Sequence, residues 1–504
     1  MFTSVDIEHL KALTGIQDPE LIEKALTVAS NFTGINLEPT ARLMLPVYKG
    51  LRDRMAVDRP TRGGPQAVWK AQLGYAGFDF SSFGTDYGAV GSAIAGSALT
   101  FQADYKTQAV KGEVTWEAIP MAQGFDDPLA VETNKALATL ISLEEKLILG
   151  ANQAALTMGS VTGSCDSSGA AFAQGNWKVQ VAALTLQGTI ANSSSAAPSH
   201  VGESLPSAAA TIAVGASGAT YLKVSWTPVP GAVGYKVYAS AAAGGTTTYL
   251  VPKTAMAYDA DTNNSMTDDG TAYIGVTSVR ITAAPSNTNQ TVASSDGTAN
   301  SYMFEGLTAW AEKSTIYGVD VTQSGSTPKL VYNAAGKQLT LSAGGIVEFD
   351  YILQRMWQQW KLSPTLIVTS PQGVAHVTSK LAGMNGGFMY RVDLTGERGG
   401  FSGGVMVRDY VNKFAANMLD GQPTVIPIWA HPDMPDGNFL FLVERVPYQY
   451  SRESRGFALD VQTPYTYFEL ARTGRTIPFS LFFTETLKCF HPAAQMALAG
   501  VRVE

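Results

Sequence analysis

The chain has 504 residues, of which 45% are hydrophobic and 15% are charged, and its formal net charge is −7. This length favours two or three domains, and the negative charge argues against bulk, non-specific binding to nucleic acid. Because charged residues fall well below the usual quarter of a soluble protein, we expect much of the surface to be buried in an assembly.

The two cysteines, Cys165 and Cys489, argue against a disulfide framework and a tetrahedral thiolate metal site. The first residues include acidic side chains where a signal peptide has a basic region and an apolar run. No apolar run reaches the roughly 18 residues that a membrane helix needs. We therefore expect a protein that is not secreted, works in a reducing compartment and has no membrane partner.

Residues 1–63 are predicted to form an N-terminal arm, because short amphipathic helices near 6–13 and 18–32 offer no core of their own. The second half of this arm is basic. Two interpretations remain open: a solvated or subunit-pairing face, and a surface that faces a polyanion such as DNA. The candidate residues for assembly or DNA contact are Arg42, Lys49, Arg52, Arg54, Arg59 and Arg62.

Residues 64–112 are predicted to form a long two-stranded excursion. Both ends read as strands, and the outgoing strand continues with apolar residues in alternation at Val110, Val114, Trp116 and Ile119. The middle is rich in glycine, serine and aromatic residues. This composition fits a tip that packs on a neighbouring copy, and it fits a flexible lid equally well.

Residues 127–149 are predicted to form one long, isolated helix. Asp127 is the expected N-cap, Pro128 occupies the first helical position and Gly150 supplies the left-handed residue that ends the helix. Side chains at spacings of three and four residues form an apolar face. Its main row is Leu129, Ala136, Leu140, Leu143 and Leu147, and the adjoining row is Thr133, Leu137, Ile141 and Ile148. At about 1.5 Å per residue the helix is roughly 35 Å long.

Residues 158–300 differ from the rest in being rich in Ala, Gly, Ser and Thr and poor in charge. Within them, YLKVSWTPVPGAVGYKVYAS reads as a strand, a turn and a second strand. This stretch resembles the B and C strands of fibronectin type III and related immunoglobulin-like sandwiches, although no clear tyrosine-corner strand follows. The resemblance implies a core built on Val224, Trp226, Tyr235 and Val237.

The remaining chain returns to an α+β pattern. FEGLTAW reads as a short helix, and Ser342 is the expected cap of a helix with one apolar face. Ser363-Pro364 ends that helix, TLIVTS is a buried strand, and Pro371 opens another helix. Several strands complete the chain. The expected apolar face is Ile346, Phe349, Leu353, Met356, Trp357 and Trp360.

Taken in order, these elements resemble the major capsid proteins of tailed phages with the Hong Kong 97-type fold. The resemblance covers residues 1–157 and 300–504 and implies an α+β capsid fold with an all-β insertion. The implied segments are the N-terminal arm 1–63, the extended loop 64–112, the peripheral domain 113–157 with its spine helix 127–149, the immunoglobulin-like or fibronectin type III-like insertion 158–300, the peripheral domain again at 301–345, the axial domain 346–460 and the closing peripheral strands 461–504.

The resemblance also implies a function. Copies of the chain would form pentamers and hexamers in an icosahedral-type shell around packaged double-stranded DNA, with the insertion decorating the outside. Scaffold, portal and decoration proteins are the expected partners, and the insertion is a candidate for contact with host surfaces or glycans. The implied location is the virion, assembled in the host cytoplasm. Some members of the family crosslink a loop lysine to a neighbouring asparagine, and Lys70, Lys106 and Lys111 lie in the corresponding region.

No enzyme or cofactor is expected. Gly400–Gly404 matches G-x-S-x-G around Ser402, with His376 and His431 elsewhere, but the surrounding pattern is a Gly-rich loop and lacks the strand and helix of a nucleophile elbow. A weak calcium candidate consists of Asp259, Asp261, Asn263 and Ser265, which lacks the glycine and glutamate of a calcium loop. A polar turn is the alternative interpretation.

Two other functions remain open at this point. A cellular nanocompartment shell of the encapsulin kind uses the same fold. A secreted binding module with a fibronectin-type domain belongs to a different class, and the missing signal peptide argues against it. Electron microscopy with sedimentation would separate shells and rings from a stable monomer.

Overall fold

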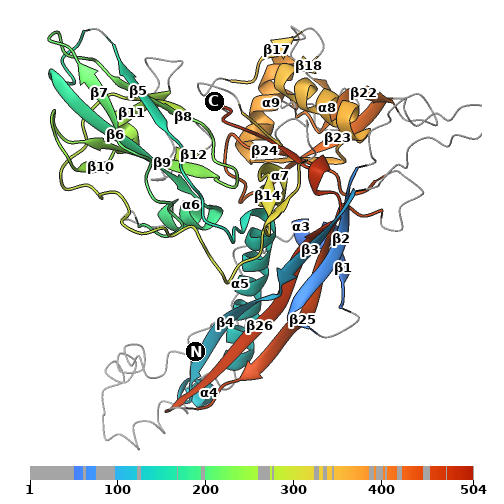
Figure 1. Cartoon of the computed structure of the whole chain (residues 1–504). Coiled ribbons are helices and arrows are strands. Elements are labelled where there is room, and N and C mark those ends of the chain that lie inside the picture. The colour runs from blue at the N-terminus through green and yellow to red at the C-terminus, as the bar shows by residue number, and fades with distance from the viewer. Residues whose placement is uncertain are drawn as a thin grey trace, which may run out of the picture. The chain divides into compact units, whose positions relative to one another are not determined.

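The structure is a computed structural model, and the chain forms two compact units. Among the described residues, one unit holds 112–136 and 469–479, and the other holds the rest (Figure 1). The described residues are 50–60, 64–74, 97–121, 127–166, 168–193, 199–258, 273–274, 277–322, 329–332, 338–342, 345–384, 391–392, 401–402, 406–416, 423–446, 454–472 and 474–502.

The long helix α5 spans Pro128–Gly150, which confirms the predicted helix. The left-handed conformation predicted for Gly150 was wrong, because this glycine is the last helical residue and has no positive φ. The Asp127 carboxylate accepts the N–H of Leu129 at 3.0 Å, as an N-cap does. Burial is concentrated in the C-terminal half of the helix, where Leu140, Leu147 and Ile148 are buried. Leu129 and Leu143 are only half-buried, and two glutamates are buried in the same stretch.

A four-stranded sheet has the order β1-β25-β26-β4. Strand β1 runs parallel to β25, with Ala56 opposite Ala458. The strands are β1 (Ala56–Asp58), β25 (Phe457–Glu469), β26 (Thr476–Cys489) and β4 (Lys106–Thr115), with the short helices α3 (Gly50–Arg54) and α4 (Ala118–Met121) next to them in sequence. The predicted alternation was wrong beyond Thr115, where β4 ends: the Trp116 indole is 57% exposed, and Ile119 lies in helix α4.

The predicted excursion has two antiparallel strands at its base, β2 (Gln66–Gly74) and β3 (Ser97–Asp104). One face of the pair is buried: Trp69 lies opposite Phe101 and stacks on it at 5.5 Å between ring centroids. The outgoing stretch is interrupted at Tyr105, because β3 pairs with β2 whereas β4 joins the four-stranded sheet. The tip, residues 75–96, lies outside the described residues.

The insertion is built from two antiparallel sheets. The first has the order β10-β9-β6-β7, with β12 also paired to β9, and the second has the order β11-β13-β8-β5. The first-sheet strands are β10 (Thr248–Leu250), β9 (Gly234–Ser240), β6 (Gly175–Leu184), β7 (Ala210–Val214) and β12 (Tyr273–Ile274); the second-sheet strands are β11 (Met256–Tyr258), β13 (Ser278–Ile281), β8 (Leu222–Trp226) and β5 (Val161–Cys165). Helix α6 (Leu186–Ser193) and the 3-10 turn η2 (Lys253–Ala255) complete it.

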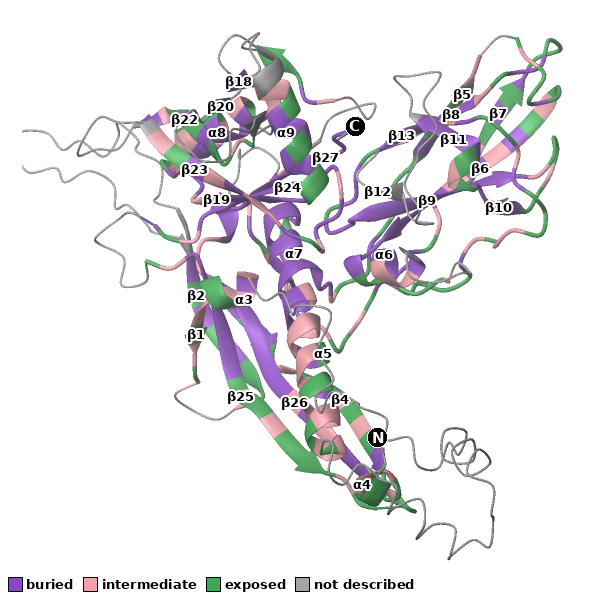
Figure 2. Ribbon diagram, turned by 180° about the vertical axis from the view of Figure 1, so that it is seen from behind, coloured by how far each residue is buried: buried purple, intermediate pink, exposed green. Residues whose placement is uncertain are grey.

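One apolar cluster fills the space between these two sheets and contains Val224, Trp226, Tyr235 and Val237. The rings of Trp226 and Tyr235 lie 5.3 Å apart, and the Tyr235 hydroxyl accepts the N–H of Val229 in the turn between their strands. Every residue of β9 is buried, as the continuous purple strand in Figure 2 shows. The residues chosen from the sequence thus lie together in the sandwich core.

A six-stranded sheet has the order β16-β27-β24-β19-β23-β22. Strand β19 runs parallel to β23 and antiparallel to β24. Its members are β16 (Leu330–Tyr332), β27 (Met496–Ala499), β24 (Phe439–Leu442), β19 (Leu366–Thr369), β23 (Pro423–Ala430) and β22 (Asp409–Ala416). Helices α8 (Val347–Trp360) and α9 (Pro371–Met384) pack on this sheet, and α9 and β19 are confirmed where the sequence predicts them.

The predicted start of α8 was wrong. Ser342 pairs with Gly345 in the small ladder β17–β18, and the helix begins at Val347 after Ile346, with no side-chain cap. Its buried face is Phe349, Ile352, Leu353 and Met356, whereas Trp357 and Trp360 are half-buried. The remaining short elements are α7 (Leu307–Glu312), β14 (Thr315–Ile316), β15 (Val319–Asp320), β17 (Leu341–Ser342), β18 (Gly345–Ile346), β20 (Arg391–Val392), β21 (Phe401–Ser402) and η3 (Pro492–Ala494).

The fold is therefore a mixed α+β fold. A paired excursion precedes one long helix, and a helix–strand–helix unit follows within a six-stranded sheet. The chain then returns through the long strands β25 and β26. The two-sheet insertion interrupts this order directly after α5.

Candidate functional site

The basic segment before β1 is engaged within its own chain. The Arg52 guanidinium donates to Glu144 at 2.6 Å, and Arg54 makes two hydrogen bonds to Glu444 at 2.9 and 2.7 Å. Arg59 is exposed. Arg42, Lys49 and Arg62 lie outside the described residues. The predicted assembly or DNA-facing surface therefore remains a prediction, and the charges of Arg52 and Arg54 are already paired with carboxylates.

The buried glutamates of α5 fasten helix α3. The Glu145 carboxylate accepts the backbone N–H groups of Leu51 at 2.7 Å and Arg52 at 3.0 Å. These N–H groups belong to the first turn of α3, where no helical carbonyl can accept them. His431 Nε2 lies 3.0 Å from the same carboxylate, and both side chains are fully buried. The N-terminal segment is thus tied to the long helix by one buried carboxylate.

Glu144 meets a second buried carboxyl, Glu485 on β26. Burial raises the pKa of Glu144 and raises the pKa of Glu485 well above its usual range. The hydrogen bond between the two carboxyl groups lowers the pKa of Glu144, whereas the charge of Glu144 and that bond raise the pKa of Glu485 further. The Tyr465 hydroxyl donates to Glu144, whereas Glu485 Oε1 has no hydrogen-bond partner. We call Glu144, Glu145 and Glu485 the spine carboxylates. Arg52 and His431 are their cationic or ionisable neighbours. A hydrogen bond between the Glu144 and Glu485 carboxyl groups requires that they share a proton.

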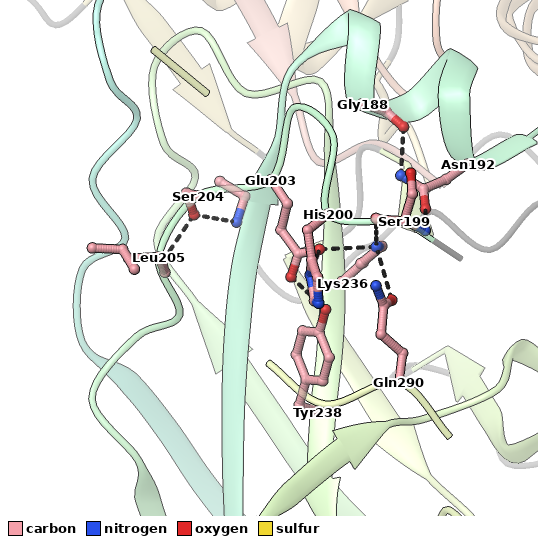
Figure 3. A network of polar contacts seen from close by, with 11 residues as sticks. Gly188, Asn192, Ser199, His200, Glu203, Ser204, Leu205, Lys236, Tyr238 and Gln290 are labelled. Atoms are coloured by element: carbon pink, nitrogen blue, oxygen red, sulfur yellow. Dashed lines mark hydrogen bonds and ion pairs between the residues drawn. The ribbon is translucent and has the colours of Figure 1, made fainter. Parts of the chain in front are cut away.

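A second buried network lies inside the insertion (Figure 3). Lys236 Nζ donates to Glu203 Oε2 at 2.9 Å, to the Ser199 carbonyl at 2.6 Å and to Gln290 Oε1 at 3.2 Å. The Tyr238 hydroxyl donates to the other oxygen of Glu203. Lys236 and Tyr238 alternate along β9 with the core residues, so their side chains lie on the opposite face of the sheet.

This strap network, defined as Lys236, Tyr238, Glu203 and Gln290, holds residues 199–207 against the sheet. Backbone N–H groups of Ser204 and Ser207 donate to carbonyls of β6 at 2.9 and 2.8 Å. The side chains of Lys236 and Glu203 are both fully buried. Burial lowers the pKa of Lys236, and the neighbouring Glu203 carboxylate raises it. The charges of the network therefore cancel within hydrogen-bonding distance.

A third buried group lies where the two ends of the insertion meet. Lys313 Nζ donates to both oxygens of Glu305, at 3.0 and 2.9 Å, and to Asn152 Oδ1. Nearby, Glu312 accepts the N–H of Gly231 at 2.7 Å, and burial raises the pKa of Glu312 to about 8. Lys313, Glu305 and Asn152 are called the base triad.

Sequence reasoning missed all three of these clusters. The one available signal is that Glu144 lies four residues from both Leu140 and Ile148, which are buried on the same helix face. Lys236, Glu203, Lys313 and their partners are far apart in the sequence and share no motif.

Apolar side chains are exposed on the outer face of the β22–β23 pair. Val411 lies directly opposite Val425, and their exposed fractions are 50% and 55%. Their neighbours Tyr410 and Ile426 point to the buried face, as alternation requires. Strand β22 is at the edge of the six-stranded sheet. Adjacent valines on a solvent-facing edge mark a surface suited to contact with another chain.

The enzyme-like and metal-like motifs form no common site among the described residues. Ser402 lies on β21, while Gly400, Gly403 and Gly404 are outside those residues. His431 faces Glu145, and burial lowers the pKa of His376 to about 4. No group of three His, Cys, Asp or Glu residues in the described ranges is arranged to hold a metal ion. The calcium candidates Asp259, Asp261, Asn263 and Ser265 also lie outside those ranges.

The lysines of the excursion are exposed or paired. Lys70 and Lys111 are exposed, and Lys106 forms an ion pair with Asp104 at 3.3 Å. Crosslinking through them remains a prediction. In the part of the chain that the structure describes, no helix has the length and apolar character needed to cross a membrane.

No family model and no curated protein matches the chain. Among solved structures, it is similar to the cyanophage A-1(L) capsid, with 11% identity, a TM-score of 0.46 and coverage of 94% of this chain and 98% of that one. It is also similar to the capsid of an empty GTA particle, with 10% identity, a TM-score of 0.41 and coverage of 95% and 98%. It is similar as well to an encapsulin complex from Synechococcus elongatus, with 8% identity, a TM-score of 0.35 and coverage of 97% of this chain and 96% of that one.

Proposed function

We propose that this chain is the major capsid protein of a tailed phage and that its copies assemble into a closed shell. Heterologous contacts between copies would close pentameric and hexameric rings. The shell would enclose double-stranded DNA, with scaffold and portal proteins as assembly partners. The order of elements supports this proposal, because an excursion, a long helix and a helix-covered sheet follow one another along the chain.

The observation that carries the proposal is the exposed valine pair at the edge of the six-stranded sheet. A solitary protein would place polar side chains at Val411 and Val425, since this face of the sheet meets water. The unpaired edge of β22 adds backbone groups that a neighbouring copy can cover. The low proportion of charged residues in the whole chain also supports burial of its surface in an assembly.

The insertion has its own core and two sheets, which supports its assignment as an immunoglobulin-like decoration on the outer surface. Its low charge and strand-rich surface suit contacts with host surfaces or glycans. The DNA-facing role belongs to the basic N-terminal segment in this proposal, and Arg59 is the described candidate with an exposed side chain.

The test is electron microscopy with sedimentation on the purified full chain, with and without co-expressed scaffold protein. Closed shells or five- and six-membered rings are the expected result. A stable monomer under both conditions would contradict the proposal and favour a binding module. Shells that enclose protein cargo and never protect DNA from nuclease would favour a nanocompartment instead.

A pair of matched variants sharpens this test. Val411→Asp and Val425→Asp should each reduce the yield of shells by more than about tenfold, because an unpaired carboxylate buried at a subunit contact costs several kcal/mol. Thr211→Asp, which adds the same charge to an exposed position of the insertion, should assemble normally. Equal yields from all three variants would exclude the β22–β23 face as an assembly surface.

A further inference from the structure

The base triad brings an amine, a carboxamide and a carboxylate together in a site that excludes water. The side chains of Lys313 and Glu305 are 10% and 3% exposed, and Asn152 is 3% exposed. Each group comes from a different segment: Asn152 follows α5, Glu305 precedes α7 and Lys313 follows it. Their combination contains every group needed to form an amide bond between two side chains.

The geometry holds the reacting groups in place. Lys313 Nζ contacts Asn152 Oδ1 on one side and both oxygens of Glu305 on the other. The Asn152 amide nitrogen donates to the carbonyls of Ala154 and Thr298, so its orientation is determined by the backbone. Because the groups are already held together, their reaction avoids the loss of translational and rotational entropy that a bimolecular reaction incurs.

The surroundings close the site. Gly231, with φ at +86°, comes so near that a Cβ there would lie 2.8 Å from Lys313 Cε and 3.4 Å from Asn152 Oδ1. A Leu156 methyl group would lie 3.4 Å from that same Cβ, and Leu156 is itself buried. Burial of this kind strengthens the contact between the Lys313 amine and the Glu305 carboxyl, because little water screens it.

We propose that Lys313 and Asn152 become joined by an intramolecular isopeptide bond, with Glu305 moving the proton. Glu305 first accepts a proton from the Lys313 ammonium. The free Nζ then attacks Asn152 Cγ, and the bond from Cγ to Nδ2 breaks. Glu305 delivers the first proton to Nδ2, which leaves as ammonia, and accepts a second proton from Nζ. This second proton then converts the ammonia to ammonium. One amide replaces another, so no oxidant, reductant or cofactor is required.

The bond would close a covalent loop that contains the whole insertion, since Asn152 and Lys313 are 161 positions apart. Both ends of the insertion already pair here: the Gly306 N–H donates to the Ala151 carbonyl at 2.9 Å, and the Asn300 N–H donates to the Gln153 carbonyl at 3.2 Å. A crosslink at this point would keep force applied to the insertion from separating those ends. This inference does not depend on the proposed shell function.

The strap network provides a comparison within the same chain. It also contains a buried Lys–Glu pair and a carboxamide, but Gln290 is half-buried and the Lys236 amine donates to the Ser199 carbonyl as well. The Ser199 carbonyl and Glu203 accept from this amine at 2.6 and 2.9 Å, whereas the carboxamide oxygen of Gln290 is farther away at 3.2 Å. We therefore assign the bond to Lys313 and Asn152 alone.

The test is the mass of the intact, full-length protein after denaturation. The wild type should be lighter than its sequence by one ammonia molecule, and protease digestion should yield one branched peptide that joins Asn152 to Lys313. Glu305→Gln and Lys313→Arg should each have the full sequence mass. Lys236→Arg should retain the mass deficit.

The wild-type measurement decides the matter even where a variant fails to fold, because mass is read from the denatured chain. A wild type with the full sequence mass, before and after assembly, would overturn the proposal. A deficit that persists in Lys313→Arg, or a branched peptide that joins Lys236 to Gln290, would overturn the assignment to the base triad.

Discussion

The strap network and the spine carboxylates are both buried, and each fastens a segment, but their charges are arranged in opposite ways. In the strap network one lysine ammonium faces one glutamate, His200 Nδ1 lies 3.0 Å from the same carboxylate, and the other contacts are to neutral groups. Around the long helix, Glu144, Glu145 and Glu485 exceed the charge that Arg52 supplies. In a balanced pair the two charges offset each other, whereas burial without enough cations raises the pKa of Glu144 and of Glu485. The contact made by the strap network should therefore change little with pH, whereas the contact made by the spine carboxylates should depend on pH.

The largest expected effect follows from removing one partner of the balanced pair. Lys236→Met leaves Glu203 as an uncompensated buried carboxylate, which should lower the free energy of unfolding of the insertion by about 3–5 kcal/mol. Denaturant unfolding of the full chain, followed by the fluorescence of Trp177 and Trp226 in the insertion core, measures the change.

Two further variants control this prediction. Lys178→Met removes a half-buried lysine from β6 and should change stability by less than about 0.5 kcal/mol. The double variant Lys236→Met with Glu203→Gln should recover part of the loss, because the buried charge is then gone. A double variant as unstable as Lys236→Met would mean that the methionine fails for reasons of packing, and the charge argument would be abandoned.

The next effect concerns pH and should appear only at the spine carboxylates. Because the folded-state pKa of Glu485 lies above its ordinary value of 4.5, the folded chain binds more protons than the unfolded chain above that pH. Stability should therefore fall as pH rises from about 4.5 toward the raised pKa. Each unit of difference is worth about 1.4 kcal/mol. Glu485→Gln cannot ionise and should flatten this slope, as seen in melting temperature against pH for the dispersed chain.

The matched control is Glu117→Gln, which changes a carboxyl that is 57% exposed. Its slope should equal that of the wild type. Strap-network variants should also retain the wild-type slope, since their pair is balanced. A wild-type slope in Glu485→Gln would show that Glu144 and Glu485 do not share a proton in the folded chain.

Local signals predicted local structure well. Asp127 with Pro128 located the start of α5, Pro371 located α9, and the pattern around Trp226 identified the sandwich core. These features depend on residues within a few positions of one another. Ser342 failed as a cap because the short β17–β18 ladder uses it instead, a choice that local sequence cannot reveal.

The buried ionic clusters could not be predicted for the same reason. Glu145 and the N–H of Leu51 are 94 positions apart, and Glu145 and His431 are 286 apart. From the sequence alone, a glutamate in an apolar helix is expected to be exposed. Its burial is tolerated only when partners satisfy the carboxylate, and here those partners are distant in the sequence. The sequence therefore located the elements but not the clusters that hold them together.

The smallest effect is expected at the exposed ion pair between Glu132 and Lys135 on helix α5. Lys135 Nζ lies 2.6 Å from Glu132, closer than Lys236 lies to Glu203, yet the two side chains are 57% and 39% exposed. Lys135→Met should change stability by about 0.5 kcal/mol or less, and the difference should disappear in high salt, because water and ions screen exposed charges. The Lys236→Met loss should persist in the same buffer. If high salt abolished the stability loss of Lys236→Met as well as that of Lys135→Met, burial would not be what distinguishes the strap network. The distance between the charged groups could not explain a difference either, because it is shorter in the exposed pair.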